Sequence, residues 1–81
     1  MKIPRDESGL SLVKRLAILG YEVTRQTGSH IRLTTNQSGI HHITIPDHST
    51  LKIGTINSIL HEIADHFKIS KEDLINKLWE K

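Results

Sequence analysis

The sequence predicts an α+β domain in which helices cover one face of a three-stranded antiparallel sheet and leave the other face open. Apolar residues recur at helical spacing near both ends of the chain, whereas residues 21–45 form short alternating segments separated by turn residues. The length of 81 residues provides for one modest core. We therefore expect a single domain over residues 1–81, with its core over residues 3–67 and a helical extension over residues 70–79.

The first element is a predicted helix over residues 9–19. Ser8 precedes it and can cap its N-terminus, and Gly20 follows it as a C-terminal stop. The apolar positions at helical spacing are Leu12, Val13, Leu16 and Leu19.

Three strands are predicted in the middle of the chain. Gly28 and Ser29 separate the first two, the turn cluster 36–39 separates the second from the third, and Pro46 ends the third. The expected strands are residues 21–25, 30–35 and 40–45.

The last third of the chain predicts a long helix and a short one. The long helix is expected near residues 53–67, and Ser70 with Asp73 resembles a capping motif for the short helix. The apolar stripe of the long helix consists of Ile53, Ile56, Leu60, Ile63 and Phe67.

Alternation along the strands predicts which side chains lie on the open face of the sheet. In the second hairpin, pairing of Leu33 with Ile43 keeps the apolar side chains on one face. In the first hairpin, a plain two-residue turn would pair Val23 with Thr34 and so place an apolar side chain beside a polar one. We therefore expect a bulge or a longer loop at Gly28-Ser29. The predicted core side chains are Ile31, Leu33, Ile43 and Ile45, and the predicted open-face side chains are His30, Arg32, Thr34, His42 and Thr44.

Composition and charge exclude several classes of function. The chain has no cysteine, which excludes disulfides, thiolate zinc sites and thiol catalysis. Residues 8–53 hold five lysines and arginines against two acidic residues, a net charge of +3, which favours an anionic partner. No apolar run is long enough to cross a membrane and no targeting segment is recognised, so we expect a cytoplasmic protein with no membrane partner.

The six histidines do not form a metal site in this pattern. His41 and His42 are adjacent on a strand and point to opposite faces, so they cannot chelate one ion. His61 and His66 are five residues apart on a helix, and we expect both to be solvated at its edges. His41 is expected to be partly buried with its hydrogen bonds satisfied. His48 lies in the strand-to-helix loop, either exposed without function or functional. We expect neither a metal nor another cofactor.

An ordered set of motifs resembles the HicA toxin family of toxin–antitoxin systems. The resemblance spans roughly residues 3–67, and nothing is carried over onto residues 70–81. It implies a fold like that of double-stranded-RNA-binding domains, with the order α-β-β-β-α, ribonuclease activity on mRNA that blocks translation, and neutralisation by a HicB antitoxin. It also implies that His30 is the catalytic histidine. The motifs are Gly20-Tyr21, Gly28-Ser29-His30, His41-His42, Ile45-Pro46-Asp47-His48, Lys52 and Gly54-Thr55.

The residues around His30 agree with that chemistry. Metal-independent RNA cleavage needs a base that takes the proton of a 2′-hydroxyl, and donors that hold the phosphate. The unperturbed pKa of histidine, about 6.5, suits the base. Gly28 lets the backbone approach a phosphate, and Ser29 and Arg32 can donate hydrogen bonds to it.

Further substrate contacts are expected from Arg25, Lys52 and His48, mainly to phosphates, so RNA binding should weaken with salt. The general acid that protonates the leaving 5′-oxygen is not identified by the sequence, and the candidates are His48, His42, Tyr21 and Lys52.

The leading hypothesis is an mRNA-cleaving toxin of a type II system, whose oligomers form only through the antitoxin complex. The alternative is a non-catalytic RNA-binding module that uses the same basic sheet face. A third hypothesis is a domain that binds only a protein partner.

Overall fold

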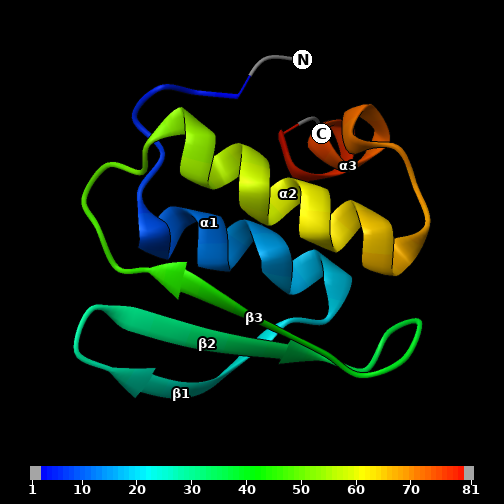
Figure 1. Cartoon of the computed structure of the whole chain (residues 1–81), viewed down its shortest axis with the longest axis horizontal. Coiled ribbons are helices and arrows are strands. Elements are labelled where there is room, and N and C mark those ends of the chain that lie inside the picture. The colour runs from blue at the N-terminus through cyan, green and yellow to red at the C-terminus, as the bar shows by residue number, and fades with distance from the viewer. Residues whose placement is uncertain (1–2, 80–81) are drawn as a thin grey trace.

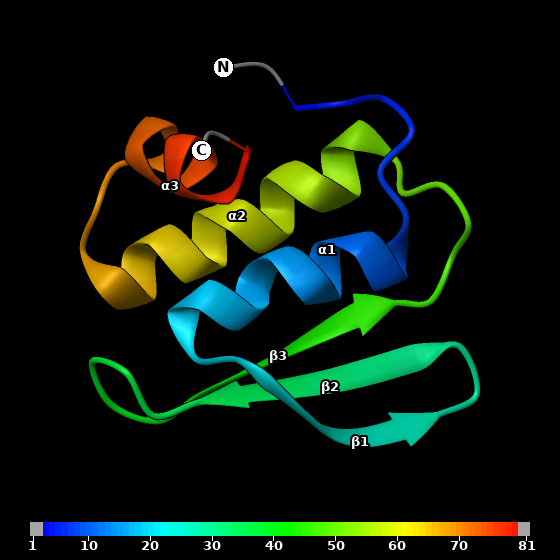
Figure 2. The same cartoon turned by 180° about the vertical axis from the view of Figure 1, so that it is seen from behind.

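The computed structural model describes residues 3–79 and shows three helices on one side of a three-stranded antiparallel sheet (Figure 1). The sheet order is β1-β2-β3, and both views show the helices above the sheet and none below it (Figures 1 and 2). This α-β-β-β-α arrangement with an added C-terminal helix confirms the predicted fold. The elements are α1 (Gly9–Leu16), the 3₁₀ helix η1 (Ala17–Leu19), β1 (Glu22–Thr27), β2 (His30–Thr35), β3 (His41–Pro46), α2 (Ile53–Phe67) and α3 (Lys71–Trp79).

The first helix begins and ends where the sequence predicts. The Ser8 hydroxyl accepts a hydrogen bond from the Ser11 N–H at 3.0 Å, and the Ser11 hydroxyl accepts one from the Ser8 N–H at 3.0 Å, which completes a capping box. The last three residues tighten into η1. Gly20 then ends the helical segment with a φ of 81°, and a β-carbon there would lie 2.8 Å from the Thr35 hydroxyl oxygen.

The register between β2 and β3 agrees with the alternation rule. Leu33 pairs with Ile43, and Ile31 pairs with Ile45, so these four side chains lie together and are buried beneath the helices. The predicted strands differ from the observed ones only at their ends, because β1 runs to Thr27 and β3 begins at His41.

The predicted irregularity in the first hairpin exists, but its expected position was wrong. Gly28 and Ser29 form a tight two-residue turn, and the pairing shifts instead between Val23 and Arg25, which makes Thr24 the extra residue. The Thr24 hydroxyl donates to the Arg32 carbonyl oxygen at 3.3 Å, which holds the bulge against β2. The bulge restores Val23 to a position opposite Leu33.

The core lies between the helices and the inner face of β2 and β3. Helices α1 and α2 each contact β3, and α3 packs against both of them. Strand β1 lies outside this cover, because all six of its residues are exposed and Val23 keeps 52% of its surface in solvent. The fully buried core side chains include Leu12, Leu16, Ile31, Leu33, Ile45, Leu51, Ile56, Leu60, Ile63 and Leu74.

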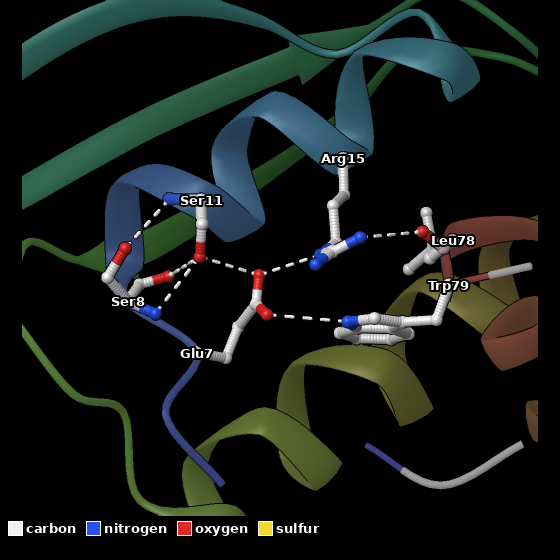
Figure 3. Close-up of polar contacts among 6 residues, drawn as sticks. All are labelled: Glu7, Ser8, Ser11, Arg15, Leu78 and Trp79. Carbon is white, nitrogen blue, oxygen red and sulfur yellow. Dashed lines mark hydrogen bonds and ion pairs between the residues drawn. The ribbon is translucent and has the colours of Figure 1, made fainter. Parts of the chain in front are cut away.

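A buried carboxylate joins both ends of the described chain (Figure 3). Glu7 is 3% exposed, and its Oε2 accepts hydrogen bonds from Arg15 Nε at 2.9 Å and from the Ser11 hydroxyl at 2.7 Å. Its Oε1 accepts one from the indole N–H of Trp79 at 3.3 Å, and Arg15 also donates to the Leu78 carbonyl oxygen at 3.2 Å. These bonds hold α3 against α1 and against the segment before α1, which contains Glu7.

The last two helices lie where the sequence predicts, and the shorter one has its predicted cap. Lys68 ends α2 in the left-handed conformation with a φ of 56°, and the Ser70 hydroxyl accepts the Asp73 N–H at 3.0 Å at the start of α3. Helix α3 buries Leu74, Leu78 and Trp79 against the rest of the domain. The predicted stripe of α2 is buried except at its ends, where Ile53 is exposed and Phe67 is half-buried.

Candidate functional site

The open face of the sheet carries the predicted polar side chains together with two from β1. Arg25 pairs with Arg32 across the first hairpin, and Thr27 pairs with His30. Because paired residues project to the same face, β1 adds a second arginine beside His30. The predicted open-face side chains are exposed or half-buried, in contrast to the buried ones between them: His30, Arg32, Thr34, His42 and Thr44.

A hollow of about 190 Å³ lies on this face, and we call it the His30 hollow. It is lined by Arg25, Thr27, His30, Arg32 and Thr44. Two guanidinium groups on directly opposed positions repel each other, which destabilises a strand pair. A bound anion would offset this repulsion, and the lining contains no carboxylate. The hollow therefore has the charge and the donors of an anion-binding site with an imidazole at its edge.

The turn beside the hollow is fixed by its backbone. Gly28 has a left-handed φ of 57° and Ser29 does not, which is the pattern of a type II′ hairpin turn. No atom lies within 4 Å of the position where a Gly28 β-carbon would stand, so the space over this residue is open to a ligand. The Ser29 carbonyl oxygen accepts the Asp47 N–H at 2.7 Å, which ties the turn to the segment after β3.

The two remaining predicted substrate contacts lie in that segment. His48 and Lys52 are exposed in the connection between β3 and α2, and neither lines the His30 hollow. The His48 carbonyl oxygen accepts the Gly9 N–H at 2.9 Å. The structure thus gathers Arg25, His30 and Arg32 in one hollow and leaves His48 and Lys52 in the loop next to its turn.

His41 lies on the helix side of the sheet in a chain of polar contacts. The Tyr21 hydroxyl lies 2.7 Å from His41 Nδ1, and His41 Nε2 lies 3.2 Å from a carboxylate oxygen of Glu62. This confirms the expectation of a partly buried histidine with satisfied hydrogen bonds. Burial, and secondly the charge of Glu62, raise the pKa of Tyr21 to about 12, so its hydroxyl stays protonated and can donate to His41 Nδ1.

The expectation of two solvated histidines on α2 holds for one of them. His61 is 75% exposed, and its ring lies 3.6 Å from Asp65. His66 is half-buried instead, because its ring stacks on His41 at 4.5 Å and its Nε2 lies 2.9 Å from the Gln37 carbonyl oxygen. The prediction for His66 was wrong because helical spacing does not show that the turn before β3 folds against this side of α2.

The raised pKa of Tyr21 predicts a pH effect that can be read directly, because the chain has one tyrosine. The folded state keeps a proton that the unfolded state loses between pH 10 and about 12, so the free energy of unfolding should fall as the pH rises through this range, by up to about 1.4 kcal/mol per pH unit. At about pH 11 the folded protein should show little tyrosinate absorbance, and the protein in urea should show nearly all of it. A native titration midpoint near 10 would contradict the buried hydrogen bond.

Two threonines of the His30 hollow were not among the predicted site residues. The sequence predicts Thr44 on the open face without a role, and Thr27 lies beyond the predicted end of its strand. Thr27 could have been found from its spacing, because it lies two residues after Arg25 and residues two apart on a strand share a face. This requires that the strand run to Thr27.

Within residues 3–79, no group of three histidine, aspartate or glutamate side chains is placed to hold a metal ion. None of the helices in that part of the chain combines the length and apolar character that a membrane crossing requires.

Comparison with protein families gives a match over most of the chain. The model of a family described as the HicA toxin of bacterial toxin–antitoxin systems matches residues 11–64, which is most of the chain and includes the whole sheet and most of α2. Comparisons with curated proteins and with solved structures returned no match.

Proposed function

This chain belongs to the HicA toxin family of bacterial toxin–antitoxin systems, and on that premise we propose that it is an endoribonuclease that cleaves mRNA and so blocks translation. The observation that carries this proposal is the His30 hollow, in which one imidazole and two arginines share an exposed sheet face. A toxin is expected to act on a substrate that the cell needs, and a hollow with this charge fits the phosphate of an RNA backbone.

In the proposed reaction, His30 takes the proton of the ribose 2′-hydroxyl, and the resulting oxyanion attacks the neighbouring phosphorus. The bond from phosphorus to the 5′-oxygen breaks, which leaves a 2′,3′-cyclic phosphate on one product and, after protonation, a 5′-hydroxyl on the other. Arg25 and Arg32 stabilise the charge that grows on the phosphate oxygens. This chemistry requires no metal, so cleavage should persist in a chelator.

The turn next to the hollow supplies the remaining substrate contacts in this proposal. The open space over Gly28 admits the RNA backbone, and the Ser29 hydroxyl is exposed beside it. His48 and Lys52 extend the contact along the connection that Asp47 ties to Ser29. Of the four candidates for the general acid, Tyr21 is the worst placed, because it is buried on the opposite side of the sheet, whereas His42, His48 and Lys52 are exposed.

We propose that a HicB-type antitoxin neutralises the toxin by covering the open sheet face. The match to a toxin–antitoxin family supports an antitoxin partner, and the exposure of His30, Arg25 and Arg32 leaves the hollow accessible to one. Translated mRNA is cytoplasmic, so the proposed activity places the toxin there.

The test is incubation of the purified chain with single-stranded mRNA, in a chelator and with the antitoxin added to a parallel sample. We expect cleavage by substoichiometric protein and its loss when the antitoxin is present. Salt-sensitive RNA binding without any product, even at protein excess, would favour the alternative of a non-catalytic RNA-binding module on the same basic face.

A further inference from the structure

A larger groove lies between the outer edge of β3 and the first half of α2. It has a volume of about 790 Å³, and we call it the β3–α2 groove. Arg32, His42 and Thr44 form its sheet side, and the exposed or half-buried hydroxyls of Thr55 and Ser58 form its helix side. None of these helix residues has a role in the reaction proposed above.

The β3–α2 groove adjoins the His30 hollow. Arg32 and Thr44 line both, so the two spaces share a wall on the open face of the sheet. A polymer that places one phosphate beside His30 therefore has a path past Arg32 and into the groove. The path leads around the edge of β3, because β3 is an outer strand of the sheet.

We infer that the β3–α2 groove binds the single-stranded RNA segment that flanks the cleaved phosphate. This inference rests on the proposed function for its choice of ligand. Arg32 and the Nε2 atom of His42, whose Nδ1 is bonded to Thr34, can donate to phosphate oxygens, and Ser58 can bond to a ribose or a phosphate. Ile59 and the neighbouring Ile43 give the groove an apolar part against which a base can pack.

The size of the groove and its position beside the His30 hollow favour one RNA strand over other occupants. Its volume is that of a small-molecule pocket, which accommodates a few nucleotides and not a duplex. The one carboxylate among these lining residues is Glu62, which lies 3.2 Å from His41 Nε2 and is 57% exposed, and Arg32 balances its charge. A protein segment could instead pair with the edge of β3. The wall shared with the His30 hollow, which carries Arg32, favours RNA.

The test compares two substitutions of the same size in the groove and one outside it. Ser58→Glu adds a negative charge, Ser58→Gln adds the same bulk without charge, and His61→Glu adds the charge at a position of the same helix that lines neither space. Each is made together with His30→Ala, so that RNA is bound and not cut. Binding of a fluorescent single-stranded RNA of about 12 nucleotides is measured by anisotropy, because single-strand sites span roughly 4–16 nucleotides.

We expect Ser58→Glu to weaken RNA binding about 10-fold relative to Ser58→Gln, and His61→Glu to weaken it less than about 3-fold, because charge repulsion falls off with distance and is screened by salt. This result supports the groove as an RNA-binding site even if the unsubstituted chain cleaves no RNA. In that case only the proposed cleavage activity fails. Equal binding by the two Ser58 variants overturns the inference, as does a loss of antitoxin binding with no change in RNA binding.

Discussion

Replacement of His30 by alanine is expected to lower the rate of RNA cleavage roughly 10²–10⁴-fold, the range that a positioned general base contributes. His30 is exposed at the edge of the hollow that also holds Arg25 and Arg32, so its loss should remove the base and leave RNA binding nearly unchanged. The measurements are the initial rate of cleavage of single-stranded RNA and the growth of cells that produce the variant, which should no longer be inhibited.

The fold of the His30→Ala variant should be unaffected, since an exposed substitution of this kind changes the free energy of unfolding by less than about 0.5 kcal/mol. Circular dichroism and urea denaturation check this point. His61→Ala serves as the matched control, because His61 is 75% exposed and lies outside the hollow, and it should keep full activity. Undiminished toxicity of the His30→Ala variant would exclude His30 as the base.

Glu7→Ala is expected to give a large loss of stability, about 2–3 kcal/mol in the free energy of unfolding, because a buried donor left without its acceptor costs about 1–3 kcal/mol. Arg15 adds less to this loss, because its side chain is 35% exposed and water can solvate its charge. The substitution removes the acceptor of Arg15, Ser11 and Trp79 at once and leaves the indole N–H of Trp79 without a partner in a buried position. Urea unfolding followed by circular dichroism measures the loss. It is a large fraction of the roughly 5–15 kcal/mol that stabilise a domain.

Two controls separate charge from hydrogen bonding at this site. Glu7→Gln keeps an acceptor oxygen and loses the charge, so its effect should lie between those of the unsubstituted chain and of Glu7→Ala. Asp6→Ala removes an exposed carboxylate from the adjacent position and should cost less than about 0.5 kcal/mol. If Glu7→Ala unfolds at the same urea concentration as the unsubstituted chain, the network in Figure 3 does not hold α3 in place.

Properties that repeat along the chain could be predicted from the sequence, and properties set by distant contacts could not. The alternation within β2 places Ile31 inside and His30 outside whatever the rest of the fold does. The position of the bulge at Thr24 depends on where the first hairpin can absorb one extra residue, and its neighbours along the chain do not specify this. Glu7 meets Trp79 across 72 residues, a contact that no local pattern indicates.

The same division applies to the site. His30 and Arg32 belong to one strand, so their common face followed from spacing alone. Arg25 joins them because the tight two-residue turn at Gly28-Ser29 sets it opposite Arg32, and the bulge at Thr24 changes the pairing only beyond that position. Thr27 joins because β1 runs two residues further than predicted. The β3–α2 groove depends on how α2 lies against the outer edge of the sheet, which helical periodicity does not define.

The central claim is that His30 removes a 2′-hydroxyl proton from RNA held in the His30 hollow. Its most direct test uses two otherwise identical single-stranded RNAs, one of which carries a single 2′-deoxynucleotide at the mapped cleavage position, both incubated with the protein in a chelator. We predict that the unmodified RNA is cut to a 2′,3′-cyclic phosphate and a 5′-hydroxyl, and that the deoxy-substituted RNA stays intact at that position. Cleavage of the deoxy-substituted RNA at the same bond, or products that carry a 5′-phosphate, would contradict the account.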